Sequence, residues 1–140
     1  MYDKIIIPTD GSEQAKEAVK QALEIAKALK AKVLALYVID TTAFSAIPKD
    51  ALTTDIHSIL LRNAQEAVNY IVRECKKLGI FVESKIAEGV PSEEIIKSAS
   101  PNDLIVIGTK GRSGVVRLLL GSVAENVVRH AKCHVLVVRK

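Results

Sequence analysis

The chain has 140 residues, of which 49% are apolar and 26% are charged. A single globular domain of this size buries about two thirds of its unfolded surface, so we expect a self-sufficient core without disulfides or structural metal. Seven glycines and four prolines are too few for a disordered or collagen-like chain. The longest apolar run, at 33–39, is far shorter than the roughly 20 residues that a membrane-spanning helix needs.

The cysteines and the first residues predict the compartment. Cys75 and Cys133 have no Cys-x-x-Cys spacing, which indicates a reducing environment rather than a disulfide framework. An apolar run follows residues 1–4 directly, without a signal-peptide pattern. We therefore expect a cytoplasmic protein with no membrane partner.

The net charge of +4 is unevenly distributed. Residues 1–109 carry 13 basic and 15 acidic side chains, whereas residues 110–140 carry seven basic side chains and one acidic side chain. This basic third favours an anionic partner, either a phosphorylated small molecule or nucleic acid, although a solvated basic surface is the ordinary alternative. No aromatic residue lies in that third, which argues against single-stranded nucleic acid.

Apolar runs alternate with helical periods along the whole chain. The expected strands are 5–7, 33–39, 80–87, 104–107 and 135–138. The expected helices are 15–29, 60–78, a short helix that begins at Pro91, and 122–131. Continuous apolar strands separated by helices predict one α/β domain over residues 1–140, an open parallel five-stranded sheet with helices on both faces. The third strand alternates polar and apolar residues, so we expect it near a sheet edge.

Local signals mark the boundaries of these elements. Residues 9–12 have turn chemistry, with Asp10 or Ser12 available as a helix cap. Gly79 is the expected stop of the long helix. Ser122 and Glu125 stand three residues apart, which predicts Ser122 as an N-cap in a capping box.

The segment 108–122 links the fourth expected strand to the last helix and contains four glycines. Glycines at such a place let backbone N–H groups approach an anion, and the helix N-terminus adds partial positive charge. The spacing matches neither the P-loop nor the dinucleotide fingerprint. The segment therefore predicts an anion or nucleotide site, but not a P-loop NTPase or a dehydrogenase.

At these residues the sequence resembles the universal stress protein family. Gly108, Gly111, Gly121 and Ser122 match its signature G-x2-G-x9-G-[ST], which is typical of the members that bind ATP. Three further segments resemble the family's first strand and loop, its loop into the third helix and its final strand: residues 5–12, 89–95 and 135–138. The likeness covers essentially the whole chain.

The resemblance implies a Rossmann-like sheet of order 3-2-1-4-5, with a crevice between the first and fourth strands where the winding reverses. It implies an ATP-binding stress-response regulatory protein, in which ATP, accompanied by Mg²⁺ or Mn²⁺, acts as a conformational or oligomeric switch with slow or no turnover. The implied nucleotide-binding residues are Pro8, Thr9, Asp10, Val38, Ile107, Gly108, Lys110, Gly111, Arg112, Gly121, Ser122 and Val123. It also implies a homodimer through the edge strand at residues 134–138.

Two other functions remain open on the sequence alone. A slow nucleotide hydrolase or phosphotransferase would use Asp10 with Lys110, the one pair that could serve it, and we assign no catalytic residue. A nucleic-acid-binding module would use the basic third. Residues 41–57 are irregular and fit either a lid over the nucleotide or a surface loop.

The histidines and cysteines support no chemistry of their own. His57, His130 and His134 lack metal-binding spacing, so we expect no protein-only metal site. Cys75 lies on an apolar helical stripe and is expected in the core. Cys133 lies in a basic turn that could lower its pKa.

Overall fold

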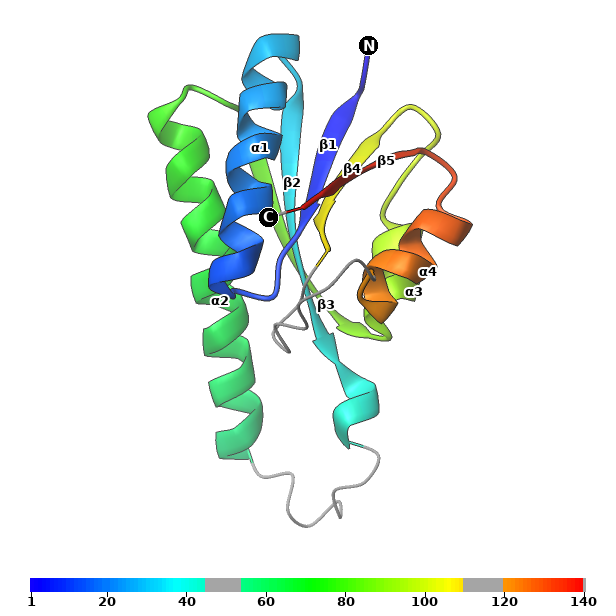
Figure 1. Cartoon of the computed structure of the whole chain (residues 1–140). Coiled ribbons are helices and arrows are strands. Elements are labelled where there is room, and N and C mark those ends of the chain that lie inside the picture. The colour runs from blue at the N-terminus through cyan, green and yellow to red at the C-terminus, as the bar shows by residue number, and fades with distance from the viewer. Residues whose placement is uncertain (45–53, 110–119, 140) are drawn as a thin grey trace.

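The computed structural model describes residues 1–44, 54–109 and 120–139 (Figure 1). The strands are β1 (Lys4–Pro8), β2 (Lys32–Asp40), β3 (Val82–Gly89), β4 (Leu104–Gly108) and β5 (His134–Val138). The helices are α1 (Glu13–Leu29), the short 3-10 helix η1 (Thr41–Phe44), α2 (Thr54–Lys77), α3 (Pro91–Lys97) and α4 (Ser122–His130). The predicted alternation of strands and helices is confirmed.

The five strands form one parallel sheet in the order β3-β2-β1-β4-β5. This confirms the predicted single-domain Rossmann-like fold. β2 and β3 lie on one side of β1, and β4 and β5, which follow later in the chain, lie on its other side (Figure 1). The winding therefore reverses between β1 and β4, and β3 and β5 become the two edge strands.

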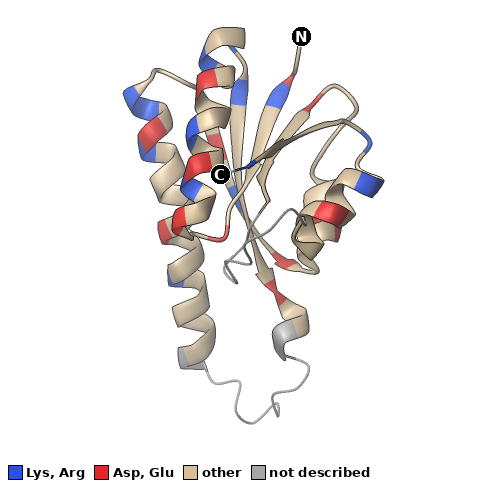
Figure 2. Cartoon of the chain, in the orientation of Figure 1, with Lys and Arg blue, Asp and Glu red and all other residues tan. Residues whose placement is uncertain are grey.

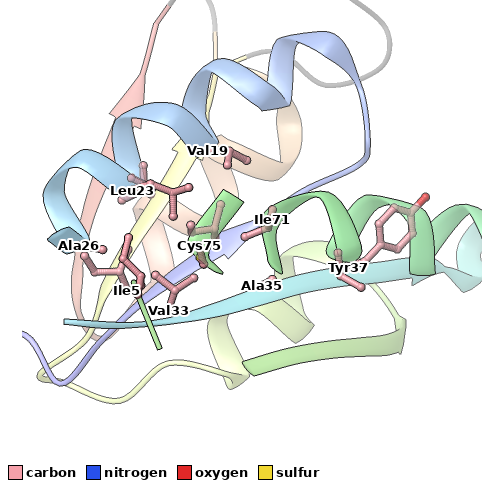
Figure 3. Packing of buried hydrophobic residues seen from close by; sticks show 14 of the residues in the cluster. Ile5, Val19, Leu23, Ala26, Val33, Ala35, Tyr37, Ile71 and Cys75 are labelled. Carbon is pink, nitrogen blue, oxygen red and sulfur yellow. The ribbon is translucent and has the colours of Figure 1, made fainter. Parts of the chain in front are cut away.

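Helices cover both faces of the sheet. α1 and α2 pack on one face, and α3 and α4 pack on the other (Figure 1). Ile5 of β1 joins the cluster under α1 and α2 (Figure 3), and so does Ile7. Ile6 joins the cluster under α3 and α4. All three side chains are fully buried, which explains why a strand whose side chains alternate between faces is apolar at every position.

α1 has a well-defined start and end. Ser12 is its N-cap, and the Ser12 Oγ accepts a hydrogen bond from the Ala15 N–H at 3.1 Å. The residues of its buried stripe are spaced at the helical period: Ala18, Val19, Ala22, Leu23 and Ala26. The helix ends at Lys30, which adopts a left-handed conformation with φ 54°.

The junction between α2 and β3 differs from the prediction. Gly79, with φ +70°, ends α2 as expected. The N–H groups of Leu78 and Ile80 both donate to the Cys75 carbonyl, at 3.0 and 2.9 Å. Because the Ile80 N–H is bonded to the last turn of α2, Ile80 belongs to the end of the helix and not to the strand. β3 therefore begins at Val82, two residues later than the sequence predicted.

β1 and β4 separate at Pro8. Two residue pairs join the strands: Ile5 with Leu104, and Ile6 with Ile105. The Thr9 N–H donates to the Leu36 carbonyl of β2 at 2.9 Å. Because the backbone groups of successive strand residues point to opposite neighbours, odd-numbered residues of β1 bond to β2 and even-numbered residues bond to β4. The next donor toward β4 would belong to residue 8, and proline has no N–H. Pairing stops there, and the carboxyl ends of the two strands part.

We expect Ile71→Ala to lower the free energy of unfolding by about 2–5 kcal/mol, because the fully buried side chain of Ile71 would leave a cavity under α2. The same change at Ile59, which lies on the same helix and is 53% exposed, should alter it by at most about 0.5 kcal/mol. Urea unfolding followed by circular dichroism measures both variants. Equal effects would contradict the orientation of α2.

Candidate functional site

A cavity of about 480 Å³ lies at the carboxyl ends of the strands, where β1 and β4 part. Its walls come from the loop after β1, the ends of β2 and β4, the start of α4 and part of α3. The lining residues are Pro8, Thr9, Asp10, Ala15, Leu36, Tyr37, Val38, Ile39, Asp40, Leu60, Pro91, Ile95, Ile107, Gly108, Thr109, Gly121, Ser122, Val123 and Ala124. The volume is that of a small-molecule pocket, at the place where open α/β sheets bind their ligands.

Nine of the twelve residues proposed from the sequence line this cavity. They are Pro8, Thr9, Asp10, Val38, Ile107, Gly108, Gly121, Ser122 and Val123. The other three, Lys110, Gly111 and Arg112, lie outside the described residues. Segments that are far apart in the sequence therefore meet at one cavity, and the ligand that they bind stays a prediction.

The end of β2 extends past the end of β1. The last residue pair is Pro8 with Leu36, whereas β2 continues to Asp40. Leu36 directs its backbone groups toward β1, and alternate residues of a parallel strand repeat that direction. The N–H and C=O of Val38 therefore face the side where β1 supplies no partner. A donor and an acceptor held side by side can bind the edge of a planar heterocycle.

α4 directs its N-terminus at the cavity. Its N-cap is Gly121, whose carbonyl accepts the first helical hydrogen bond from the Glu125 N–H at 2.9 Å. Glycine has no side-chain oxygen, so the cap residue itself supplies no hydrogen bond, and none of the described side chains caps the N–H groups of the first turn, at Ser122, Val123 and Ala124. A bare helix N-terminus of this kind binds anions.

The prediction that Ser122 caps α4 is wrong. Ser122 is the first residue of the helix, and the cap position belongs to Gly121, which adopts the extended conformation that a cap requires (φ −64°, ψ 159°). The Glu125 carboxylate pairs with Arg129 at 3.0 Å instead of folding back on the helix start. Ser122 therefore has no capping role, and it lines the cavity.

The two ends of the glycine-rich segment meet at Gly121 and Thr109. The Gly121 N–H donates to the Thr109 carbonyl at 3.0 Å. A Cβ at position 121 would lie 3.2 Å from that carbonyl oxygen, closer than most side-chain carbons approach, so any other residue would have to displace Thr109 by a few tenths of an ångström. The Thr109 N–H in turn donates to the Val138 carbonyl of β5 at 3.1 Å, which ties the start of the segment to the sheet.

Two carboxylates stand at the cavity. Asp10 Oδ1 accepts a hydrogen bond from the Ser12 N–H at 2.9 Å, which is the turn role that the sequence left open. Asp40 Oδ1 accepts one from the Thr42 N–H, also at 2.9 Å. Among the lining residues that the structure describes there is no lysine, arginine or histidine. The described wall is therefore acidic, and it lies opposite the positive end of α4.

Ten of the lining residues were not proposed from the sequence, among them Tyr37, Asp40, Pro91 and Ile95. Pro91 and Ile95 form an apolar wall from α3, which packs against β2 because β2 and β3 are neighbours. Asp40 ends β2 one residue beyond the predicted strand. The resemblance of residues 89–95 to the family's loop into the third helix could have drawn attention to α3, but only the strand order places that loop beside β2.

Each of the three histidines has its own partner. His57 Nε2 lies 3.4 Å from Glu88 Oε1, His130 Nδ1 bonds to the Asn126 carbonyl, and Tyr2 bonds to the ring of His134. Within the described ranges, no group of three or more His, Cys, Asp or Glu side chains could hold a metal ion. The expectation that residues 41–57 are irregular is wrong at both ends, since residues 41–44 form η1 and α2 begins at Thr54. Residues 45–53, on which the choice between a lid and a surface loop depends, lie outside the described residues.

Neither thiol has the chemistry of a reactive cysteine. Cys75 is buried, as predicted, and burial, with a smaller contribution from Glu74, raises its pKa to about 11. The expectation that the basic turn could lower the pKa of Cys133 is wrong. Partial burial raises that pKa, and the negative charge of Asp103 adds to the effect.

An open parallel α/β sheet with a pocket where its winding reverses is typical of a class of ligand-binding proteins. Comparison of this chain with known proteins identifies one family within that class. The profile of the universal stress protein family matches residues 1–139. The universal stress protein MJ0531 of Methanocaldococcus jannaschii is 43% identical over 142 residues, which cover 100% of this chain and 84% of that protein. The chain therefore belongs to the universal stress protein family.

Solved structures agree with this assignment. The structure of MJ0577, also from Methanocaldococcus jannaschii, is 34% identical, with a TM-score of 0.83 over 100% of this chain and 97% of that one. A universal stress protein in complex with cAMP is 27% identical, with a TM-score of 0.68 over 99% of this chain and 97% of that one.

None of the helices in the described ranges is long and apolar enough to span a membrane.

We expect both thiols of the native protein to react slowly with Ellman's reagent at pH 8, and Cys75 more slowly than Cys133. A pKa of about 11 leaves Cys75 with about 100-fold less thiolate than an unperturbed cysteine, and burial shields the sulfur as well. The rate should rise with pH, because the thiolate is the reactive form. Single Cys→Ser variants assign the two rates, and the unfolded protein supplies the reference. Fast labelling of Cys75 would contradict its place in the core.

Proposed function

We propose that this chain binds an adenine nucleotide, ATP with an accompanying Mg²⁺ or Mn²⁺, and acts as a stress-response regulatory protein with a nucleotide-dependent conformation or oligomeric state. The observation that carries the proposal is the cavity at the parted ends of β1 and β4. It joins a strand end with free backbone groups to a bare helix N-terminus.

The two ends of this cavity suit the two ends of a nucleotide. The backbone N–H and C=O of Val38 can form hydrogen bonds with the edge of adenine. The apolar side chains of Ile95 and Ile107 can pack against its faces. The first turn of α4 and the Ser122 hydroxyl suit the phosphates. The ribose then lies near Thr9 and Asp10. Because the base contacts are backbone contacts, other adenine nucleotides compete for the same place.

The charge of the cavity supports an accompanying cation. Asp10 and Asp40 would repel a polyphosphate, and no basic residue lines the described wall. The end of a helix supplies only about half an elementary charge. We therefore propose that a divalent metal bound by the phosphates, together with Lys110 and Arg112 of the glycine-rich segment, neutralises the rest of the phosphate charge.

Family membership supports nucleotide binding. The chain carries the complete glycine signature, and a relative of the same fold was solved with cAMP bound. That ligand contains adenine and phosphate, the two groups to which we assign the ends of the cavity. Cyclic AMP and AMP therefore belong beside ATP in any binding test.

Binding is favoured over catalysis. The Asp10 carboxylate takes part in the turn through the Ser12 N–H, so one oxygen of the nominated base is already engaged. The described lining offers no cationic side chain to stabilise a leaving group. The hydrolase alternative depends on Asp10, and turnover that persists in Asp10→Ala would remove that role.

We propose that β5 forms the homodimer interface. β5 is an edge strand, and its Leu136 side chain is 39% exposed. The Val138 carbonyl accepts a hydrogen bond from the N–H of Thr109, the residue after β4, so the backbone groups of even-numbered β5 residues face β4. Those of Val135 and Val137 therefore face the open edge. A second copy of the strand could pair there about a two-fold axis.

We expect Gly121→Val to weaken ATP binding by at least about tenfold, which equals a loss of about 1.4 kcal/mol. The Cβ of valine would lie 3.2 Å from the Thr109 carbonyl, and its branched side chain adds to this crowding, so the substitution should displace the ends of the segment that is proposed to hold the phosphates. Calorimetric titration with ATP and Mg²⁺, and in parallel with AMP, cAMP and adenosine, measures the loss.

Gly79→Ala is the control for stability in this experiment. Gly79 has φ +70° and open space around it, so alanine there costs about 1–2 kcal/mol of backbone strain at the opposite end of the molecule. That variant should bind ATP as the parent does. Full ATP binding by folded Gly121→Val would count against the phosphate site, and absence of binding by the parent protein would remove the proposal.

We expect Val135→Pro to give a folded monomer and Leu136→Pro to give unfolded protein. Proline at 135 removes an N–H from the open edge, where edge strands tolerate it. Proline at 136 removes an N–H that bonds to β4. Light scattering reports the mass of each variant, and circular dichroism reports its folding. A folded dimer in Val135→Pro would place the interface elsewhere.

A further inference from the structure

A second groove, of about 400 Å³, lies at the opposite end of the sheet from the nucleotide cavity. It is lined by the C-terminal end of α1 and by the segments that follow α1 and α2. The C-terminal ends of both helices lie in the upper part of Figure 1. Its lining residues are Ala26, Lys27, Lys30, Ala31, Lys32, Leu78, Gly79, Ile80 and Phe81. Neither the family signature nor the proposed nucleotide site uses any of them.

The rim of this groove is basic. Three of the lining residues are lysines, Lys27, Lys30 and Lys32, and none of them is paired with a described carboxylate. Figure 2 shows basic segments at this end of the molecule, at the last turns of α1 and α2 and the first residues of β2. Helix dipoles account for Lys27 and Lys30, which lie at the end of α1. They do not account for Lys32, which begins β2.

The floor and one wall of the groove are apolar. Ala26, Ala31 and Ile80 are buried at its base. Phe81 is 65% exposed and Leu78 is 38% exposed beside them. An exposed phenylalanine is notable in a chain with two phenylalanines and no tryptophan.

The position of Phe81 is fixed by the sheet. Its carbonyl accepts a hydrogen bond from the Val33 N–H of β2 at 2.9 Å, immediately before β3 begins. The exposed ring therefore belongs to an anchored backbone rather than to a frayed end. An aromatic side chain held in this way, beside a recess and unpaired cations, is typical of the centre of a recognition surface.

We propose that this groove binds an acidic, hydrophobic segment of a partner protein, in which aspartate or glutamate alternates with leucine or phenylalanine. The carboxylates would pair with Lys27, Lys30 and Lys32, and the apolar side chains would pack on Phe81 and the floor. Charge complementarity selects an acidic partner. The apolar floor argues against nucleic acid, and the recessed shape argues against a flat membrane surface.

The groove and the nucleotide cavity lie at opposite ends of α1. Ser12 caps α1 beside the nucleotide cavity, and Lys30 ends it at the groove. The two sites share no lining residue, so a partner segment and a nucleotide can be bound together. The inference therefore does not depend on the proposed nucleotide site and can be tested without ATP.

Fluorescence anisotropy with synthetic peptides tests this proposal on the whole protein. The probe is a fluorescein-labelled ten-residue peptide that alternates aspartate with leucine and phenylalanine. One control peptide replaces the apolar residues by serine, and another replaces aspartate by lysine. We expect saturable binding of the probe alone, weakened by rising salt because charge pairs contribute to it.

Matched variants locate the site. The double variant Lys27→Glu, Lys32→Glu and the single variant Phe81→Ser should each weaken binding by about tenfold or more. Lys20→Glu with Lys85→Glu makes the same charge change at exposed positions outside the groove, and Val128→Ser removes an exposed apolar side chain on α4. These controls should bind the probe as the parent does, and melting temperatures check that every variant is folded.

Several outcomes would overturn the proposal. Absence of probe binding, equal binding of the serine peptide, or equal losses in the control variants would each show that the groove does not recognise such a segment. Binding of phosphatidylglycerol vesicles that requires Phe81 and the three lysines, without binding of the probe, would assign the surface to a membrane instead.

Discussion

The separation of β1 from β4 is the constraint on which the functional end of this molecule depends. The two strands are neighbours because the winding of the sheet reverses there, and their pairing ends where residue 8 should donate the next hydrogen bond. Proline cannot donate it. The carboxyl ends of the strands therefore open, β2 continues past them, and the backbone groups of Val38 lose the neighbour that would have paired with them.

The same opening decides how the glycine-rich segment is used. Its start is tied to β5 through Thr109, and its end meets Thr109 again at Gly121, so its two ends are fixed beside the cavity. Because the cap of α4 is a glycine, the helix start keeps its N–H groups free of side-chain caps. A serine in that place would have supplied a cap and competed with an anion for those groups. The glycine thus serves both the close contact and the bare helix end.

α1 extends from an acidic site at one end of the molecule to a basic site at the other. Its N-terminus adjoins an acidic cavity with Asp10 and Asp40, and its C-terminus adjoins the basic groove with Lys27, Lys30 and Lys32. The separation of charge follows in part from the helix dipole, which favours acidic residues at one end and basic residues at the other. Because the two sites lie at opposite ends of α1 and share no lining residue, a ligand at one site would not displace a ligand at the other.

The sequence by itself determined the class of fold, the buried strands and the nucleotide signature. Ile5, Ile6 and Ile7 are apolar at successive positions because both faces of the sheet are covered, and such runs are visible without a structure. Apolar spacing could not decide the cap of α4, which lies at the contact of Gly121 with Thr109, or the pKa of Cys133, which burial and the charge of Asp103 raise. It also missed the start of β3, which follows the hydrogen bonds to Cys75 at the end of α2. Tertiary structure alone brought Pro91 and Ile95 to the cavity and placed Phe81 beside three lysines. Sequence patterns report which faces are buried, but strand order and register determine which segments meet.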